Sequence, residues 1–318
     1  MTLLGVYILK RILSMIPTLI GVSLLVFLLM QLIPGTVVEQ MLGVEGNSRE
    51  AQKQLEEFFG LNQPVIVQYW HWFSGIMVGD FGVSWRSGEA ILPTLLNAFI
   101  ITCEMAILSV IVCVIIGVPL GILAALKPYG LIDNILRILS LAGVSIPVFF
   151  QGTLLMLIFS LYFPWSPPVV YQYPWESLSQ NLQIMILPAI ALGIASSAVV
   201  MRMTRSSLLE TLGQDFIRTA RSKGITETAV IFGHALKNIL ISVITAVGLE
   251  MGQIFGGIVV VEVVFSLPGV GQLIFNSLLQ RDFPIVTSGI LFVTVVVLII
   301  NTIIDLTYKF VDPRIRFD

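Results

Sequence analysis

Four acidic residues interrupt the apolar stretches of this sequence and are the first candidates for chemistry: Glu104, Glu250, Glu262 and Asp305. Burying a carboxylate in a membrane is costly, so an acid inside a span commonly marks a solute or proton pathway. Three of the four fall near the ends of the expected spans, where water or a hydrogen bond can satisfy them. Glu250 lies deeper and is the better candidate. Other polar positions in the spans could share such a pathway with it: Ser145, Gln253 and Asn301.

A basic stretch between two apolar segments is the second candidate. It reads DFIRTARSKG over 215–224 and HALKN over 234–238. We expect a helix over 212–223, because Gly224 suits the position that follows a helix end. Thr226 can cap a second helix that runs into the next apolar segment.

The first of these expected helices has two different faces. Phe216 and Ala220 are four residues apart on one face, and Arg218 and Arg221 are three apart on another. This pattern predicts an apolar knob beside a basic surface, which suits docking to a separate motor protein. The alternative is that the charges only set topology and bind anionic lipid. We assign the docking contact to these positions: Asp215, Phe216, Arg218, Thr219, Ala220, Arg221, Lys223 and Gly224.

Motifs for catalysis and energy conversion are missing from the chain. The sequence contains no Gly-x4-Gly-Lys-Ser/Thr loop for nucleotide phosphates, no His-Glu-x-x-His helix and no Gly-x-Ser-x-Gly elbow. Its two histidines, His71 and His234, fall on opposite sides of the expected membrane and cannot share a metal. We therefore expect a subunit that is not an enzyme and that itself binds no cofactor or metal.

Composition places the chain among multi-pass membrane proteins. Of its 318 residues, 56% are hydrophobic and 11% are charged. A helix needs about 20 apolar residues to cross the hydrocarbon core. The sequence therefore predicts an all-α fold with six transmembrane helices: 12–33, 99–123, 137–161, 183–203, 239–262 and 285–310. The fourth is the weakest, because Pro188 and several small residues interrupt it. The first is too long for a signal-peptide core, so we expect it to be retained.

The distribution of Lys and Arg predicts the orientation. Thirteen of the 17 basic residues fall on the side that holds both termini, which the positive-inside rule makes cytoplasmic. The expected organisation is then the first span within 1–33, an extracytoplasmic segment over 34–98, a five-helix core over 99–310 with its cytoplasmic loop at 204–238, and a cytoplasmic tail over 311–318.

The extracytoplasmic segment contains its own structural signals. Asn47 and Glu50 have the spacing of a capping box, and Gly60 suits a helix stop. An aromatic cluster follows, which either lies at headgroup level or packs a small external subdomain: Tyr69, Trp70, Trp72 and Phe73.

Small residues and prolines recur inside the expected spans. Gly248, Gly252 and Gly256 repeat at every fourth position and form a groove that admits another helix, from this chain or from another subunit. Gly117 and Gly121 have the same spacing. Four prolines predict kinks: Pro17, Pro119, Pro147 and Pro188.

From Arg218 to Asn238 the chain resembles the cytoplasmic loop of permease subunits of bacterial ABC importers. The family pattern is Glu-Ala-Ala, three residues, Gly, nine residues and Ile-x-Leu-Pro. Here Arg218-Thr219-Ala220, Gly224 and His234-x-Leu236-Lys237 stand at those positions. The loop is most similar to the dipeptide, oligopeptide and nickel branch.

Further stretches along the whole chain are similar to that branch: RILSMIPTLIGVSLLVFLLMQLIPG, FGLNQPVIVQYWHWFSGIMVGDFGVSW, VVVEVVFSLPGVGQL, RDFPIV and DPRIR. One departure is Thr36-Val37, where the branch commonly has Asp-Pro. The resemblance implies a type I ABC importer permease in the bacterial inner membrane. It also implies three kinds of partner: a homologous second permease, two cytoplasmic ATPases that bind ATP and Mg²⁺, and an extracytoplasmic solute-binding protein.

The resemblance favours import of dipeptides or oligopeptides. The same architecture could import nickel, a metal–chelator complex or glutathione, and the sequence does not decide which solute is carried. A rival from another class is an ion-coupled carrier that uses Glu250 and Asp305. An intramembrane hydrolase is disfavoured, because the sequence has no Gly-x-Gly-Asp or Ser/His constellation.

Overall fold

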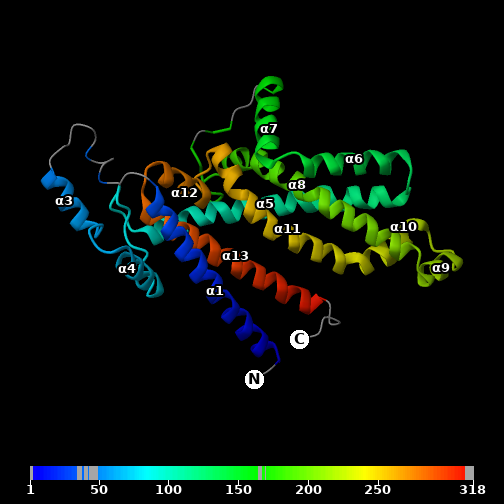
Figure 1. Cartoon of the computed structure of the whole chain (residues 1–318). Coiled ribbons are helices and arrows are strands. Elements are labelled where there is room, and N and C mark those ends of the chain that lie inside the picture. The colour runs from blue at the N-terminus through cyan, green and yellow to red at the C-terminus, as the bar shows by residue number, and fades with distance from the viewer. Residues whose placement is uncertain are drawn as a thin grey trace. The chain divides into compact units, whose positions relative to one another are not determined.

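The computed structural model describes residues 3–33, 38, 42, 49–163, 167–168 and 170–311. Asn47, Thr36-Val37 and the DPRIR stretch lie outside the described residues. The regular secondary structure of the described part is helical, apart from one antiparallel bridge between Val83 and Ala90. Its helices are shown in Figure 1 and have these bounds: α1 Leu3–Leu32, α3 Arg49–Phe58, α4 Val65–Met77, α5 Ile91–Leu126, α6 Leu131–Ser145, α7 Val148–Tyr162, α8 Leu178–Leu212, α9 Asp215–Ser222, α10 Glu227–Ala229, the π-helix η1 Val230–Ala235, α11 Leu236–Phe265, α12 Val270–Leu279 and α13 Phe283–Val311.

The membrane spans lie where the sequence predicts them. Among the described residues, five helical segments are long and apolar enough to cross a membrane: Leu9–Leu32, Ile91–Leu126, Leu178–Leu212, Glu227–Phe265 and Phe283–Thr307. The pair α6 and α7 supplies a sixth span if it is counted as one. The prediction of six spans is thereby confirmed, but the third is not a single straight helix, because α6 and α7 are bent by 107° relative to each other.

Pro147 explains this bend. A proline lacks the backbone N–H that would continue the helix, and it disfavours helical dihedrals in the residue before it. Ile146 accordingly adopts an extended conformation, with φ −86° and ψ 125°. Gln151 of α7 then donates its side-chain amide to the carbonyl oxygens of Gly143 and Ile146, both at 2.8 Å. These bonds satisfy carbonyl groups that the end of α6 leaves without a helical partner.

The described chain forms two compact units. Unit 1 holds residues 3–101 and 268–302, and unit 2 holds residues 102–267 and 303–311. The core of unit 1 joins the start of α5 to α12 and α13 through these buried side chains: Ile91, Leu95, Ala98, Val270 and Ile285. Gly289 lets α13 approach α12 closely, because a Cβ atom there would lie 2.7 Å from Cγ1 of Ile274.

Unit 2 is organised around α8. Of the most apolar window of α8, 72% is buried, against 17–33% for the other four long spans. In Figure 1, α6 and α11 run beside α8, and α7 also packs against α8 and α11. This central position explains why the fourth span looked weak in the sequence. A helix that is surrounded by other helices needs small side chains for close approach more than it needs large apolar ones.

Glycines set the distance between α5 and α8. A Cβ atom on Gly121 would lie 2.6 Å from Cβ of Thr204 and 2.7 Å from the carbonyl oxygen of Met201. From the other side, a Cβ atom on Gly193 would lie 2.6 Å from Cγ1 of Val112. The pair predicted at Gly117 and Gly121 is thus a packing site between two helices of this chain.

The groove predicted on α11 has a different environment. Gly256 is exposed, and a Cβ atom there would meet no described atom within 4 Å. Exposed residues continue the same stripe of α11 at Leu249, Gln253 and Val260. The described part of the chain therefore leaves this stripe uncovered.

Candidate docking surface and solute-facing residues

Local sequence signals isolate α9 as a separate short helix. The preceding helix α8 ends at Leu212, so the helix expected over 212–223 begins three residues later, at Asp215. Asp215 in the first turn and Arg221 in the last turn both suit the helix dipole. Gly224 follows at φ +77°, in the left-handed region that favours glycine, and turns the chain into the next segment.

The underside of α9 is a packing surface. Ile217 is 0% exposed and Ala220 is 7% exposed, and both belong to an apolar cluster with Leu208 of α8. Other members come from the end of α5 and from the segment that leads into α11: Ala125, Val230, Ala235 and Ile239. Burying an isoleucine side chain contributes about 1.5–3 kcal/mol, so this cluster fixes α9 on unit 2.

Only one of the two predicted knob residues faces outward. Phe216 is 39% exposed, whereas Ala220 packs inside its own chain. The prediction that Ala220 belongs to an exposed apolar knob is therefore wrong: Ala220 packs with Ile217 on the inner side of the helix, and Phe216 lies at the edge of that side. Ile217 was not among the predicted positions, although it lies three residues before Ala220 and so on the same side of the helix.

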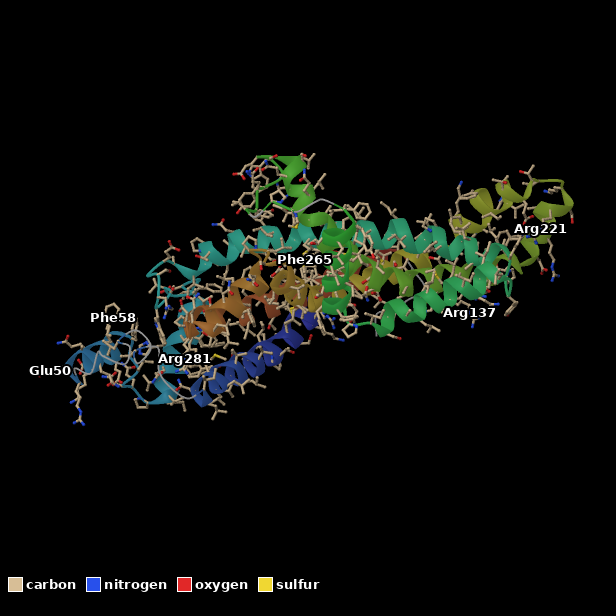
Figure 2. The ribbon with its side chains drawn as sticks, turned by 90° about the horizontal axis from the view of Figure 1, so that it is seen from above. Glu50, Phe58, Arg137, Arg221, Phe265 and Arg281 are labelled. Carbon is tan, nitrogen blue, oxygen red and sulfur yellow. The ribbon has the colours of Figure 1, made fainter. Side chains whose placement is uncertain are left out.

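Charged side chains surround the exposed edge of α9. Arg218 lies 3.5 Å from Asp215, and both side chains are largely exposed. Arg221 forms a two-pronged pair with Glu227, at 3.1 Å from Nε and 2.6 Å from Nη2. The hydrogen bonds to Glu227 raise the pKa of the Arg221 guanidinium. In Figure 2, Arg137 and Arg221 both lie toward the end of unit 2 that carries α9.

The helix after this loop starts irregularly. It begins after Thr226, as predicted, but the Thr226 side chain makes no capping hydrogen bond. The chain runs through α10 and the π-helix η1 before α11 continues it. His234 belongs to η1, and its carbonyl oxygen accepts a bond from the Asn238 side chain at 2.8 Å.

The four expected pathway residues lie on three helices, α6, α11 and α13. Glu250 is buried in unit 2, where it is hydrogen-bonded to Ser196 of α8. Ser145 and Gln253 are exposed, on α6 and α11. Asn301 is half-buried on the part of α13 that belongs to unit 1. Gln253 is the one of the four that lies on the uncovered stripe of α11.

Glu262 and Glu104, two of the acids that the sequence places near span ends, accept hydrogen bonds inside unit 2. Glu262 is fully buried and accepts a bond from the Thr102 hydroxyl at 2.6 Å. Glu104 accepts a bond from the Tyr171 hydroxyl. Burial and the Glu104 carboxylate raise the pKa of Tyr171, which lies outside the spans. The expectation of hydrogen-bonded acids is confirmed for this pair, although Glu262 is not solvated.

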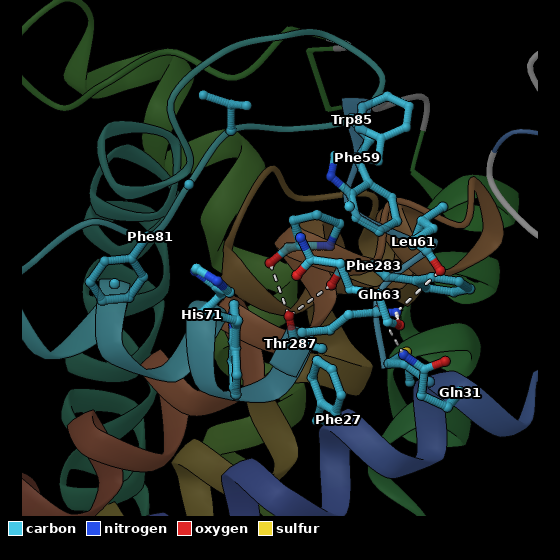
Figure 3. Close-up of a pocket in the computed structure, with 18 of the residues that line it drawn as sticks. Phe27, Gln31, Phe59, Leu61, Gln63, His71, Phe81, Trp85, Phe283 and Thr287 are labelled. Atoms are coloured by element: carbon cyan, nitrogen blue, oxygen red, sulfur yellow. Dashed lines mark hydrogen bonds between the residues drawn. The ribbon is translucent and has the colours of Figure 1, made fainter. Parts of the chain in front are cut away.

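Unit 1 contains a cavity of about 850 Å³. Figure 3 shows that side chains from α1, α4 and the start of α13 face it, among them Phe27, His71 and Thr287. Small-molecule sites have volumes of this order. None of the expected site residues lines the cavity. The sequence feature that could have indicated this cavity was the aromatic cluster at 69–73. Three members of the cluster pack against each other or against Phe27: Tyr69, Trp72 and Phe73.

A buried carboxylate anchors the loop that borders this cavity. Asp282 is 3% exposed and accepts bonds from the Ser84 hydroxyl and from the Trp85 backbone N–H, the latter at 3.1 Å. The Ser84 oxygen in turn accepts the backbone N–H groups of Arg86 and Ser87. Asp282 thus ties the turn between α12 and α13 to the loop around the Val83–Ala90 bridge.

Asp282→Ala is expected to open this loop. Removing the carboxylate leaves the buried Ser84 hydroxyl and the part-buried Trp85 N–H without their acceptor, at a cost of about 3 kcal/mol. Tryptic cleavage after Arg86 in the purified protein should therefore accelerate. The matched control is Asp80→Ala in the same loop, because the exposed Asp80 accepts only the Gly82 N–H among the described bonds. Equal cleavage rates for the two variants would contradict the anchoring role.

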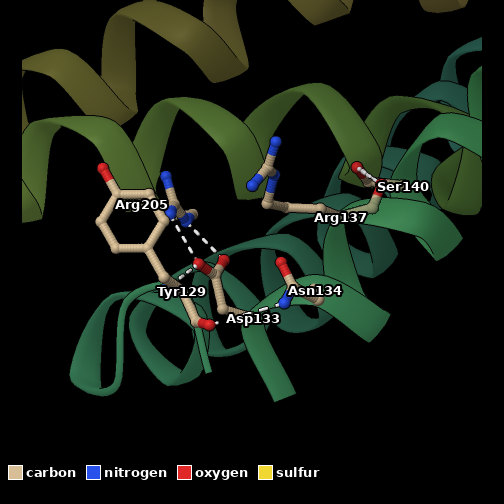
Figure 4. A network of polar contacts seen from close by, with 6 residues as sticks. All are labelled: Tyr129, Asp133, Asn134, Arg137, Ser140 and Arg205. Atoms are coloured by element: carbon tan, nitrogen blue, oxygen red, sulfur yellow. Dashed lines mark hydrogen bonds and ion pairs between the residues drawn. The ribbon is translucent and has the colours of Figure 1, made fainter. Parts of the chain in front are cut away.

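A second buried carboxylate was not singled out by sequence reasoning. Asp133 of α6 is 0% exposed and pairs with Arg205 of α8 through two bonds of 2.6 Å, as Figure 4 shows. The only signal in the sequence was an acid in the first turn of an apolar helix. Its partner, Arg205, lies 72 residues further along the chain and was counted only among the basic residues that predict the orientation in the membrane.

Comparisons with known proteins define the class. Residues 117–317 match the family described as "Binding-protein-dependent transport system inner membrane component", and residues 4–106 match its N-terminal counterpart, "Binding-prot-dependent transport system membrane comp, N-term". The chain belongs to this family. It is a permease subunit of a bacterial ABC importer, a multi-pass protein of the inner membrane that works as part of a multi-subunit transport system.

Named relatives cover nearly the whole chain. The Dipeptide transport system permease protein DppB of Escherichia coli (strain K12) is 37% identical over 333 residues, with 98% of both chains covered. The protein of the same name from Alkalihalophilus pseudofirmus is 38% identical over 335 residues, covering 98% of this chain and 99% of the relative. The Glutathione transport system permease protein GsiC of Salmonella typhi is 37% identical over 311 residues, with the same coverage.

Proposed function

We propose that this permease imports dipeptides or short oligopeptides and forms half of a translocation pathway that ATPases on other chains open and close. Two similar relatives are named for a dipeptide and for glutathione, which is itself a short peptide. This shared chemistry supports a peptide as the solute. Nickel or a metal–chelator complex is the alternative that the resemblance leaves within the same architecture.

The geometry of α9 is the observation that carries the coupling role. Its inner face is fixed by Ile217 and Ala220, while Phe216 is presented outward beside Arg218. A short helix that is anchored below and exposed above can transmit a push without deforming. The proposed docking contact comprises the outward residues of the loop, with Ala220 acting from inside: Asp215, Phe216, Arg218, Thr219, Arg221, Lys223 and Gly224.

The proposed partners are those that the resemblance to ABC importer permeases implies. Two ATPases bind ATP and Mg²⁺, and one of them docks at α9 on the cytoplasmic side, where the positive-inside rule places the loop and both termini. A homologous second permease covers the uncovered stripe of α11 around Gly256, beside the half-buried Gly248 and Gly252, with Gln253 facing the shared pathway. An extracytoplasmic binding protein delivers the solute. This chain contributes no catalysis and binds no cofactor of its own.

Reconstituted transport tests the proposal. The complete importer, with both permeases, the ATPases and the binding protein, is placed in proteoliposomes and supplied with labelled dipeptide, glutathione or Ni²⁺. We expect dipeptide uptake that requires ATP and survives dissipation of the proton gradient. Preferential uptake of Ni²⁺ would reject the peptide assignment. Uptake that collapses with the proton gradient at constant ATP would indicate an ion-coupled carrier instead.

A further inference from the structure

The pair between the buried Asp133 and the half-buried Arg205 is the most completely satisfied charge contact in unit 2 among the described residues. Arg205 donates Nε to Oδ1 and Nη2 to Oδ2 of Asp133, both at 2.6 Å, so the planar groups meet in the bidentate geometry (Figure 4). The Tyr129 backbone N–H adds a third bond to Oδ2 at 2.8 Å. Tyr129 takes φ +62°, a left-handed conformation that is unusual for a tyrosine, and this conformation brings its N–H to the carboxylate.

This pair is the specific tie between α6 and α8. The buried residues of α6 are Asp133 and Ser140, and both are polar. The Ser140 hydroxyl bonds to the Arg137 carbonyl of its own helix, so it does not reach α8 by a described bond. Asp133 and Arg205 lie just beyond the expected spans 137–161 and 183–203, at the end of the two helices that is expected to be cytoplasmic. At such a place a bidentate pair adds geometric specificity as well as energy. Among the described hydrogen bonds and ion pairs, the pair between Asp133 and Arg205 is therefore the one that joins α6 directly to α8.

On the α8 side, the pair lies close to the base of α9. Leu208 follows Arg205 by three residues, one helical turn, and is fully buried in the cluster that holds Ile217 and Ala220. The same C-terminal part of α8 thus contacts both α9, through Leu208, and α6, through Arg205.

At its other end, α6 is bonded to α7, and α7 in turn packs against α11. Gln151 of α7 holds the end of α6 through its bonds to Gly143 and Ile146. Gly152, the next residue, is buried where α7 meets α11, and a Cβ atom there would lie 2.8 Å from Cε2 of Phe265. A contiguous series of contacts therefore runs from α9 through α8, α6 and α7 to the end of α11.

We propose that Asp133 and Arg205 are positioning residues that make α6 and α7 move with α9 when the ATPases close. The inference rests on the proposed function of α9. Losing the pair should leave α9 on its cluster and the ATPases attached, while α6 and α7 follow their movement less completely. ATP would then be hydrolysed with fewer solutes moved.

The experiment measures ATP hydrolysed per dipeptide imported in proteoliposomes that contain the complete importer. Asp133→Asn keeps the shape of the side chain and an acceptor for Tyr129 but removes the charge. We expect its ratio of ATP to dipeptide to rise roughly tenfold, within the range of about 5–150-fold that coupling between sites usually spans. The matched control is Ser140→Ala, the other buried polar side chain of α6, which should keep the wild-type ratio.

The ratio separates coupling from stability. A purely structural role would reduce the amount of assembled complex but leave the ratio unchanged in what remains, and that result would overturn the proposal. If Asp133→Asn does not assemble, Arg205→Lys carries the test, because it keeps the charges paired and removes only the two-pronged geometry. A raised ratio for Arg205→Lys supports the proposal and a wild-type ratio rejects it. A wild-type importer without ATP-dependent dipeptide uptake would instead reject the proposed function.

Discussion

Phe216→Glu is expected to detach the ATPases and abolish uptake of the solute. Phe216 is the exposed apolar side chain of α9, at the edge of a helix that is otherwise charged on its outer surface. Truncating an aromatic residue at the centre of an interface commonly costs about 2–4 kcal/mol, which is roughly 30- to 1,000-fold in affinity. A buried carboxylate in place of the ring adds a desolvation cost.

The measurement is co-purification of the ATPases with the permease pair, followed by ATP-dependent uptake in proteoliposomes. Phe216→Leu is the control, because it keeps an apolar side chain at the same position and should retain most of the binding. Since Phe216 is only half-buried in its own chain, the thermal unfolding of the isolated permease should hardly change. Full ATPase retention by the Glu variant would show that the docking surface lies elsewhere.

The neighbouring positions should respond in a different way. Enlarging Ala220 disturbs the cluster beneath α9 and so acts on the fold of the loop before it acts on any partner. Gly224 has free space around it, but its φ of +77° costs another residue about 1 kcal/mol. Bulky residues at both positions are therefore expected to weaken assembly or uncouple transport from ATP hydrolysis, through the position of α9 rather than through its outer surface.

Gly121→Ala is expected to destabilise unit 2 more than the same change does elsewhere in the chain. The added Cβ atom would lie 2.7 Å from the carbonyl oxygen of Met201, a backbone atom that cannot rotate away. Forcing α5 and α8 apart loosens the packing around the central helix. Overpacking of this kind costs about 3 kcal/mol or more when the neighbour is rigid.

The measurement is the thermal unfolding midpoint in detergent, with the fraction of monodisperse protein after extraction. Gly21→Ala is the matched control, because that glycine of α1 has no described atom within 4 Å of an added Cβ. Gly256→Leu extends the comparison: the isolated chain should tolerate it, whereas assembly with the second permease should weaken. Equal midpoints for Gly121→Ala and Gly21→Ala would contradict the tight crossing of α5 and α8.

Properties that depend on composition and local signals were predictable from the sequence. Runs of apolar residues located the spans, Pro147 marked the break, and Gly224 marked the end of the docking helix. Each of these signals determines the conformation of residues that are close to it in the sequence. Ala220 was wrongly predicted to be exposed, because a four-residue spacing shows which side chains share a face of a helix but not whether that face points to solvent or to the protein.

Long-range pairings were not predictable, because no local pattern records them. Asp133 meets Arg205 across 72 residues, and Ser84 meets Asp282 across 198. In each case, the sequence shows an ordinary charged residue near the end of an apolar stretch. Only the packing of helices reveals that the carboxylate is buried and that its donors surround it.

The π-helix η1 has a consequence for comparing related permeases. Its six residues, Val230–Ala235, follow a wider coil than an α-helix, so the segment accommodates one residue more per turn. Deleting a single amino acid there would leave an ordinary α-helix, and every position of α11 beyond Leu236 would keep its orientation. When homologous sequences differ in length by one near this point, the gap in their alignment belongs in this turn, and the helix that follows can be compared position by position.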